Sequence, residues 1–157
     1  HLAVITHNAN PELNNMLSQI REIKVNYRSK RVKESLTDPA QLPAVIRRLL
    51  PDNSREHFIA LYLDGSNRLI CYRIISTGSG NECPVRVRDV MQAAMLTGAL
   101  GLIIAHNHPS QSIAPSPEDK VVTDKIKDAA KLLGINLLDS IIVTDDNYYS
   151  ACQSSAL

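Results

Sequence analysis

The sequence predicts an α/β fold, a three-layer sandwich in which helices flank a mixed β-sheet. Two observations carry this prediction. The chain of 157 residues is 44% hydrophobic and 21% charged, which suits one globular domain with a buried core. From residue 57 onward, strand and helix patterns follow in the order β-β-α-β-α-β-β, which is typical of a sheet covered by helices.

The predicted elements follow from the spacing of apolar and turn residues. Apolar runs on either side of Asp64-Gly65-Ser66-Asn67 predict a hairpin, because these four residues favour a tight turn. Ser116-Pro117 is a favourable helix start after a polar, proline-rich stretch. In chain order, the sequence predicts strands at 57–63 and 68–76, a helix at about 88–100, a strand at 101–105, a helix from 116 to about 134, and strands at 135–144 and 148–150.

A separate N-terminal segment is predicted. A short helix begins at Asn10, a strand or arm follows at 23–27, and a further helix begins at the Asp38-Pro39 pair and ends at Pro51. We therefore predict a helical and basic extension at 1–37 and a domain at 38–157. The extension contains basic residues that could bind nucleic-acid phosphates or simply face solvent, namely Arg21, Lys24, Arg28, Lys30, Arg31 and Lys33.

Charge and cysteine content limit the classes of partner and compartment. With 17 basic and 16 acidic side chains the formal charge is +1, so no overall field attracts nucleic acid or an anionic membrane. Cys71, Cys83 and Cys152 lack a paired spacing, which argues against a thiolate zinc site and favours a reducing compartment. The apolar runs are too short to cross a bilayer, and the first residues lack a signal-peptide pattern. These features predict a cytoplasmic protein with no membrane partner.

Two histidines and one aspartate form the pattern that carries chemistry. His106 and His108 stand two positions apart at the end of a predicted strand, so both rings can project to the same side. Asp119 falls in the first turn of the next helix, where the helix dipole favours a carboxylate. Two imidazoles and one carboxylate suit one Zn²⁺ ion and leave a fourth position for water. A catalytic site also needs a carboxylate that takes the proton of this water, and Glu56 is the candidate.

The same residues resemble the motif of a known family. His106-x-His108, followed after seven residues by Ser116 and then by Asp119, with Glu56 upstream, is similar to the JAMM motif of JAB/MPN metalloproteases. The segments at 56–58, 63–64, 106–110, 133–135 and 138–139 resemble the RadC-like branch of that family. The resemblance extends over roughly residues 42–150.

This resemblance implies both an architecture and an activity. The architecture is JAB/MPN-like, which is also cytidine-deaminase-like, and the activity is zinc-dependent hydrolysis of a peptide or isopeptide bond. The resemblance implies that His106, His108 and Asp119 bind one zinc ion, and that Glu56 acts as general acid and base. It also implies that Ser116 donates a hydrogen bond to the developing oxyanion. The RadC-like branch carries a DNA-repair label, so the alternative function is a DNA-associated accessory protein with a structural metal.

Simpler roles for the same residues remain open. Ser116 is also a good helix cap, and Glu56 is equally compatible with a solvated surface charge. The chain departs from the RadC-like pattern at Gln111, where glycine is usual, and at Ser140, where histidine is frequent. Neither residue belongs to the motif, so the departures affect substrate fit more than metal binding. A cytidine-deaminase site is excluded, because the Pro-Cys-x-x-Cys pattern is absent from the sequence.

Overall fold

The computed structural model describes residue 25, residue 36 and residues 40–78 and 84–157. The helix predicted from Asn10 and the basic residues of the extension lie outside these residues. So does nearly all of the strand predicted at 23–27, of which the described part is Val25, in no regular element. The division at residue 37 therefore stays a prediction.

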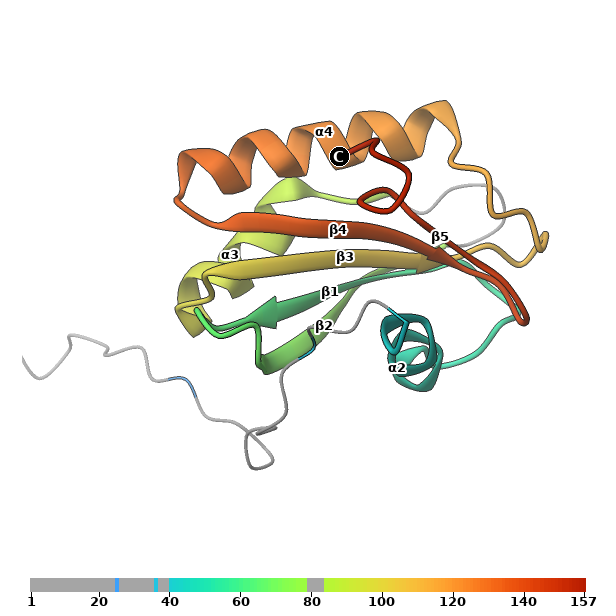
Figure 1. The fold of residues 1–157 in the computed structure, drawn as a ribbon, viewed down its shortest axis with the longest axis horizontal. Coiled ribbons are helices and arrows are strands. Elements are labelled where there is room, and N and C mark those ends of the chain that lie inside the picture. The colour runs from blue at the N-terminus through green and yellow to red at the C-terminus, as the bar shows by residue number, and fades with distance from the viewer. Residues whose placement is uncertain (1–24, 26–35, 37–39, 79–83) are drawn as a thin grey trace, which may run out of the picture.

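Five strands form one mixed sheet with the order β2-β1-β3-β4-β5 (Figure 1). The middle strand, β3, pairs antiparallel with β1 and parallel with β4, so the sheet is mixed as predicted. The outer pairs, β1 with β2 and β4 with β5, are antiparallel. The strands are β1 (His57–Leu63), β2 (Leu69–Thr77), β3 (Gly101–Asn107), β4 (Asn136–Val143) and β5 (Tyr148–Ser150).

Helices cover both faces of this sheet, which gives the predicted three layers (Figure 1). Helices α3 (Val87–Thr97) and α4 (Pro117–Leu132) pack on one face, and α2 (Leu42–Leu49) packs on the other. Each helix buries an apolar stripe against the strands, as an amphipathic helix on a sheet must. Among the described residues, no helix combines the length and the apolar character that crossing a bilayer needs.

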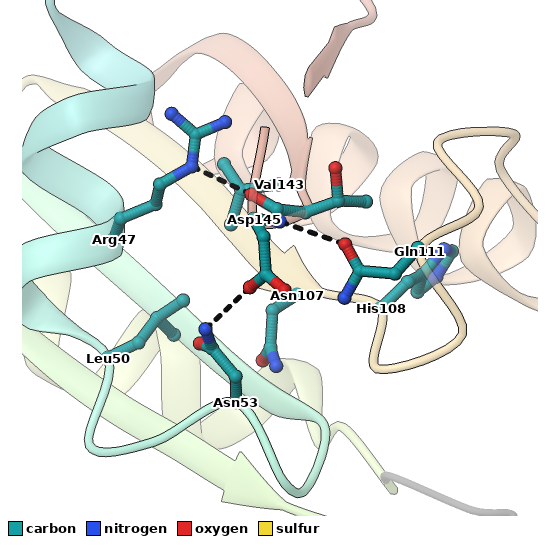
Figure 2. Close-up of a pocket in the computed structure, with 9 residues that line it drawn as sticks. Arg47, Leu50, Asn53, Asn107, His108, Gln111, Val143 and Asp145 are labelled. Carbon is teal, nitrogen blue, oxygen red and sulfur yellow. Dashed lines mark hydrogen bonds between the residues drawn. The ribbon is translucent and has the colours of Figure 1, made fainter. Parts of the chain in front are cut away.

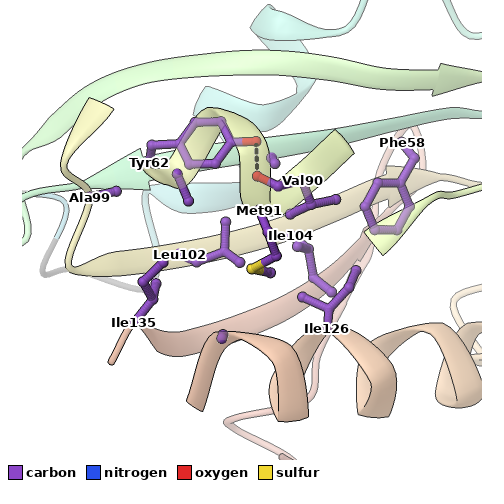
Figure 3. Packing of buried hydrophobic residues seen from close by; sticks show 12 residues of the cluster. Phe58, Tyr62, Val90, Met91, Ala99, Leu102, Ile104, Ile126 and Ile135 are labelled. Carbon is purple, nitrogen blue, oxygen red and sulfur yellow. Dashed lines mark hydrogen bonds between the residues drawn. The ribbon is translucent and has the colours of Figure 1, made fainter. Parts of the chain in front are cut away.

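The alternation of side chains along β1 divides the hydrophobic core into two parts. Every residue of β1 is buried, because the strand has a neighbour on each side and helices above and below. One set of alternating residues packs beneath α3 and α4, where the Tyr62 hydroxyl donates a hydrogen bond to the Val90 carbonyl (Figure 3). The first set is Phe58, Ala60 and Tyr62, and the set facing α2 is Ile59, Leu61 and Leu63.

Element boundaries agree with the predictions to within a few residues. The bounds of β1 and β5 are those predicted, whereas β3 runs two residues further than the predicted 101–105 and includes His106 and Asn107. The helix predicted to reach residue 100 ends at Thr97, because Gly98 adopts the left-handed conformation with φ 65° and stops it. The extension of β3 matters most, because it places His106 inside the sheet.

The core beneath α2 can be tested with Ile46→Ala. The Ile46 side chain is completely buried, so its truncation should lower the free energy of unfolding by about 2–5 kcal/mol. Leu132→Ala is the control, because Leu132 is 87% exposed and its truncation should change stability by less than about 0.5 kcal/mol. Urea unfolding measures both. Equal stability of the two variants would contradict the packing of α2 on the sheet.

Candidate metal centre

The rings of His106 and His108 meet at the end of β3. His106 is 3% exposed and lies within the strand, and His108 follows directly after it. The amide of His108 still donates to the Val143 carbonyl, so the chain keeps its extended course past the last residue of β3. As the spacing of two predicts, both side chains project to one side, and their Nε2 atoms are 3.1 Å apart.

Asp119 reaches the same point from the start of α4. Its Oδ1 lies 3.3 Å from Nε2 of His106, and its Oδ2 lies 3.6 Å from Nε2 of His108. A capping box fixes the carboxylate: Ser116 donates to Oδ2 from its amide at 2.7 Å and from its hydroxyl at 2.6 Å. The Asp119 amide donates in return to the Ser116 hydroxyl at 3.1 Å. The carboxylate is therefore oriented by the same bonds that begin the helix.

Each histidine ring also has a contact outside the cluster that holds it in place. Nδ1 of His108 lies 2.7 Å from the carbonyl oxygen of Ser112. Since a carbonyl can only accept, Nδ1 must carry the proton, and Nε2 of the neutral ring presents its lone pair to the other two residues. The His106 ring stacks on Phe58, with centroids 5.9 Å apart and an interplanar angle of 10°. Both rings are oriented before any ligand arrives.

The charges at this centre favour a cation. Burial raises the pKa of the Asp119 carboxyl, but the neighbouring His106, His108 and Ser116 side chains lower it by more, so the net pKa lies well below its usual range. Asp119 is therefore ionised at neutral pH. The Asp119 carboxylate, opposed by burial, raises the pKa of His108 above its usual value. A positive charge is thus stabilised where the three side chains meet.

The donor set fits a zinc ion. One ligating atom from each of His106, His108 and Asp119 lies within 4.8 Å of the other two, a spacing that a single ion can bridge. Two imidazole nitrogens and one carboxylate oxygen are zinc ligands, and three protein ligands are typical of a catalytic rather than a closed structural site. The hydrogen bond from Nδ1 of His108 to a backbone carbonyl is a usual outer contact of a metal-ligating histidine.

Glu56 lies next to this centre, although sequence spacing could not place it. Phe58 pairs with His106 in the antiparallel register of β1 and β3, and continuing that register by two residues sets Glu56 opposite His108. The negative charge of Glu56 contributes to the raised pKa of His108. The Glu56 carbonyl accepts a hydrogen bond from the Gly78 amide at 2.7 Å, which ties this position to the end of β2.

A cleft of about 670 Å³ opens beside the three clustered residues, a size that suits a small ligand or a peptide segment. Glu56, Ser116 and Asp119 all contribute to its wall. A second hollow of about 310 Å³ is lined by Arg55 and Gly78 among others. Glu56 and His108 line both depressions.

Gln111, one of the two departures from the family pattern, stabilises the loop behind His108. It adopts φ 65°, a left-handed conformation that glycine takes without strain. Its side-chain oxygen accepts a hydrogen bond from the Asp145 amide at 3.0 Å, while Asn53 donates to the Asp145 carboxylate (Figure 2). The space enclosed there is about 10 Å³, too small for a substrate group. Gln111 thus adopts a conformation that glycine would take without strain, and its side chain anchors this loop to the turn after β4.

The other predicted residues have the following places. Ser116 lines the cleft, but its hydroxyl is already donated to Asp119, so the capping role is observed and an oxyanion role stays a prediction. Ser140 bonds Thr123 through their hydroxyls at 3.1 Å, which joins β4 to α4. Asn107 is a further residue of the site that the sequence motif does not single out, and its buried side chain bonds the segment around Glu56. Its position between the two histidines was the available signal.

Comparison with known proteins agrees with this architecture. The fold, a mixed sheet between helices with the histidine pair at the end of its middle strand, is that of a JAB domain. A family model described as a RadC-like JAB domain matches residues 36–156. The chain therefore belongs to the RadC-like JAB family, as the sequence motif predicts.

Curated relatives share this region of the chain. A UPF0758 protein of Methanosarcina acetivorans is 38% identical over 118 residues, which are 75% of this chain and 52% of that protein. A UPF0758 protein of Trichlorobacter lovleyi is 40% identical over 124 residues, 79% of this chain and 54% of that protein. A UPF0758 protein of Lactococcus lactis subsp. cremoris is 44% identical over 96 residues, 61% and 42% of the two chains. The chain thus spans about half the length of these relatives.

The raised pKa of His108 makes metal affinity depend on pH. Zinc binds the neutral ring, so below this pKa a proton must leave His108 before the metal can bind. Because the pKa lies above the usual 6.5, zinc affinity should fall about tenfold between pH 6.5 and pH 5.5 and level off at higher pH. Asp119, with its lowered pKa, adds no dependence in this range. Competition with a chromophoric chelator measures the affinity, and a constant value across this range would contradict the assignment.

Proposed function

We propose that the chain is a zinc-dependent hydrolase of the JAMM type that cleaves an amide bond of a peptide or isopeptide. The observation that carries the proposal is the cluster of His106, His108 and Asp119 at a cleft whose wall includes His108, Asp119 and Glu56. A zinc ion held there would polarise the scissile carbonyl and make a water molecule more acidic. Membership of the JAB family supports the same reaction class.

The residues of the chain have separate roles in this proposal. His106, His108 and Asp119 would hold the metal through two imidazole nitrogens and a carboxylate oxygen. The Glu56 carboxylate takes a proton from the attacking water and later delivers it to the nitrogen of the leaving amine. The Ser116 hydroxyl donates to the developing oxyanion only after it turns away from Oδ2 of Asp119, to which it is bound in this structure.

The shape of the cleft supports a substrate larger than a single amino acid. Apolar side chains of Phe58, Val85 and Val122 line the larger depression, whereas Arg55 and Ser54 line the smaller one. The larger depression also contains polar side chains such as Ser110 and Ser112, so a substrate whose bond is cleaved beside Glu56 can find both apolar and polar partners. This mixture is compatible with a peptide chain or with an isopeptide-linked side chain.

Binding of DNA through the N-terminal basic residues stays a separate prediction. Those residues lie outside the part of the chain that the structure describes, so no contact or patch among the described residues bears on it. The hydrolase proposal does not depend on it.

Glu56→Gln tests the proposed reaction. The amide has nearly the shape of the carboxylate but cannot accept the proton, so turnover should fall by about 10²–10⁴-fold while zinc content stays at that of the wild type. Turnover is measured as amine release from a panel of peptide and isopeptide substrates, with zinc content determined on the same samples. In the control, chelated wild type should regain turnover when zinc is restored. A Glu56→Gln variant with full zinc-dependent turnover would refute the proposal.

A further inference from the structure

We infer that Asn107 is a positioning residue that holds Glu56 against the metal centre. This inference rests on the proposed function, because it concerns the residue to which that proposal gives the proton-transfer role. Asn107 is the last residue of β3 and lies between His106 and His108 in the chain, and its side chain bonds the backbone at the start of β1. It is 4% exposed, so its amide must find partners inside the protein.

The side-chain amide of Asn107 forms hydrogen bonds with the backbone on both sides of Glu56. Its Oδ1 accepts a hydrogen bond from the His57 amide at 2.8 Å, and its Nδ2 donates one to the Arg55 carbonyl at 2.9 Å. These two partners are the residues immediately before and after Glu56 in the chain. One side chain thus fixes both flanking peptides of the candidate proton-transfer residue.

The position of these bonds in the sheet gives them their importance. The backbone pairing of β1 with β3 stops at Phe58 and His106. One residue further along the register, where His57 would pair with Asn107, the Asn107 side chain bonds the backbone amide of His57. One more residue along the same register sets Glu56 opposite His108. The two strands are therefore joined by a side-chain clamp at the place where Glu56 meets the metal ligands.

Only a side chain with both a donor and an acceptor can form this clamp. An aspartate keeps the acceptor for the His57 amide but would set a second acceptor against the Arg55 carbonyl, and alanine forms neither bond. The fold should tolerate the loss, because the Glu56 carbonyl remains bonded to the Gly78 amide and Nδ1 of His57 remains bonded to Thr77. The expected result of Asn107→Ala is a folded protein in which Glu56 is less firmly placed.

Hydrogen exchange of the metal-free protein tests the clamp itself. In Asn107→Ala the His57 amide should exchange about tenfold faster than in the wild type, while amides in the middle of β3 and β4 keep their rates. Asn136→Ala is the matched control, because this asparagine is exposed at the start of β4 and should leave the His57 amide unchanged. Unaltered exchange at His57 in Asn107→Ala would overturn the inference.

The pH dependence of the cobalt-substituted protein tests the consequence for Glu56. The visible spectrum of bound Co²⁺ reports charge changes near the metal, so the pH midpoint of its change should shift in Glu56→Gln. Asn107→Ala should shift the midpoint in the same direction. The double variant that carries both substitutions should have the same midpoint as Glu56→Gln alone. A shift from Asn107→Ala that is added in full to that of Glu56→Gln would mean that Asn107 acts through the histidines, which overturns the inference.

The two ways of failing can be told apart. Absence of cobalt binding by the wild type would refute the proposed function, and this inference with it. The metal centre would stand but this inference would be overturned if the wild type binds cobalt normally and Glu56→Gln leaves the pH midpoint of the cobalt spectrum unchanged. Glu56 would then have no effect on the metal centre, so its positioning by Asn107 could have none either.

Discussion

The backbone pairing that holds β3 in the middle of the sheet sets the position of the whole candidate metal centre. With β1 on one side and β4 on the other, β3 is completely buried, and its side chains have little freedom to move. His106 inherits this rigidity and gains a stacking contact with Phe58 on the neighbouring strand. The register with β1, continued two residues beyond the Phe58–His106 pair, then sets Glu56, which lies just before β1, opposite His108.

The third ligand depends on how α4 begins and on how it is attached. The capping box between Ser116 and Asp119 turns the carboxylate toward the histidines while it satisfies amides at the helix start. Further along, Thr123 bonds Ser140 of β4, and Ile126 packs in the core, so α4 cannot slide along the sheet. The centre therefore joins a buried strand to a capped helix, two elements that are rigid for different reasons.

Most elements of the fold and the metal-ligand cluster could be predicted from the sequence. The features that could not be predicted depend on contacts between segments that are distant in the sequence. A continuous apolar run and clear turn residues set the bounds of β1, and the histidine spacing with Asp119 predicted the cluster, because both depend on local patterns. The proximity of Glu56 depends on strand register, which local patterns do not specify. The predicted strand at 101–105 is two residues shorter than β3, because the apolar run ends at Ala105, whereas hydrogen bonding and stacking allow polar Asn107 and His106 to be buried within the strand.

Anomalous diffraction at the zinc edge from crystals of the zinc-loaded protein tests the central claim most directly. A single zinc ion held by His106, His108 and Asp119 predicts one strong peak, about 2.0–2.2 Å from Nε2 of each histidine and from a carboxylate oxygen of Asp119. The same data from an Asp119→Ala crystal should lack this peak, whereas Asp128→Ala, which removes an exposed carboxylate of the same helix, should keep it. Zinc bound elsewhere in the wild type, or no peak between the three side chains, would contradict the account.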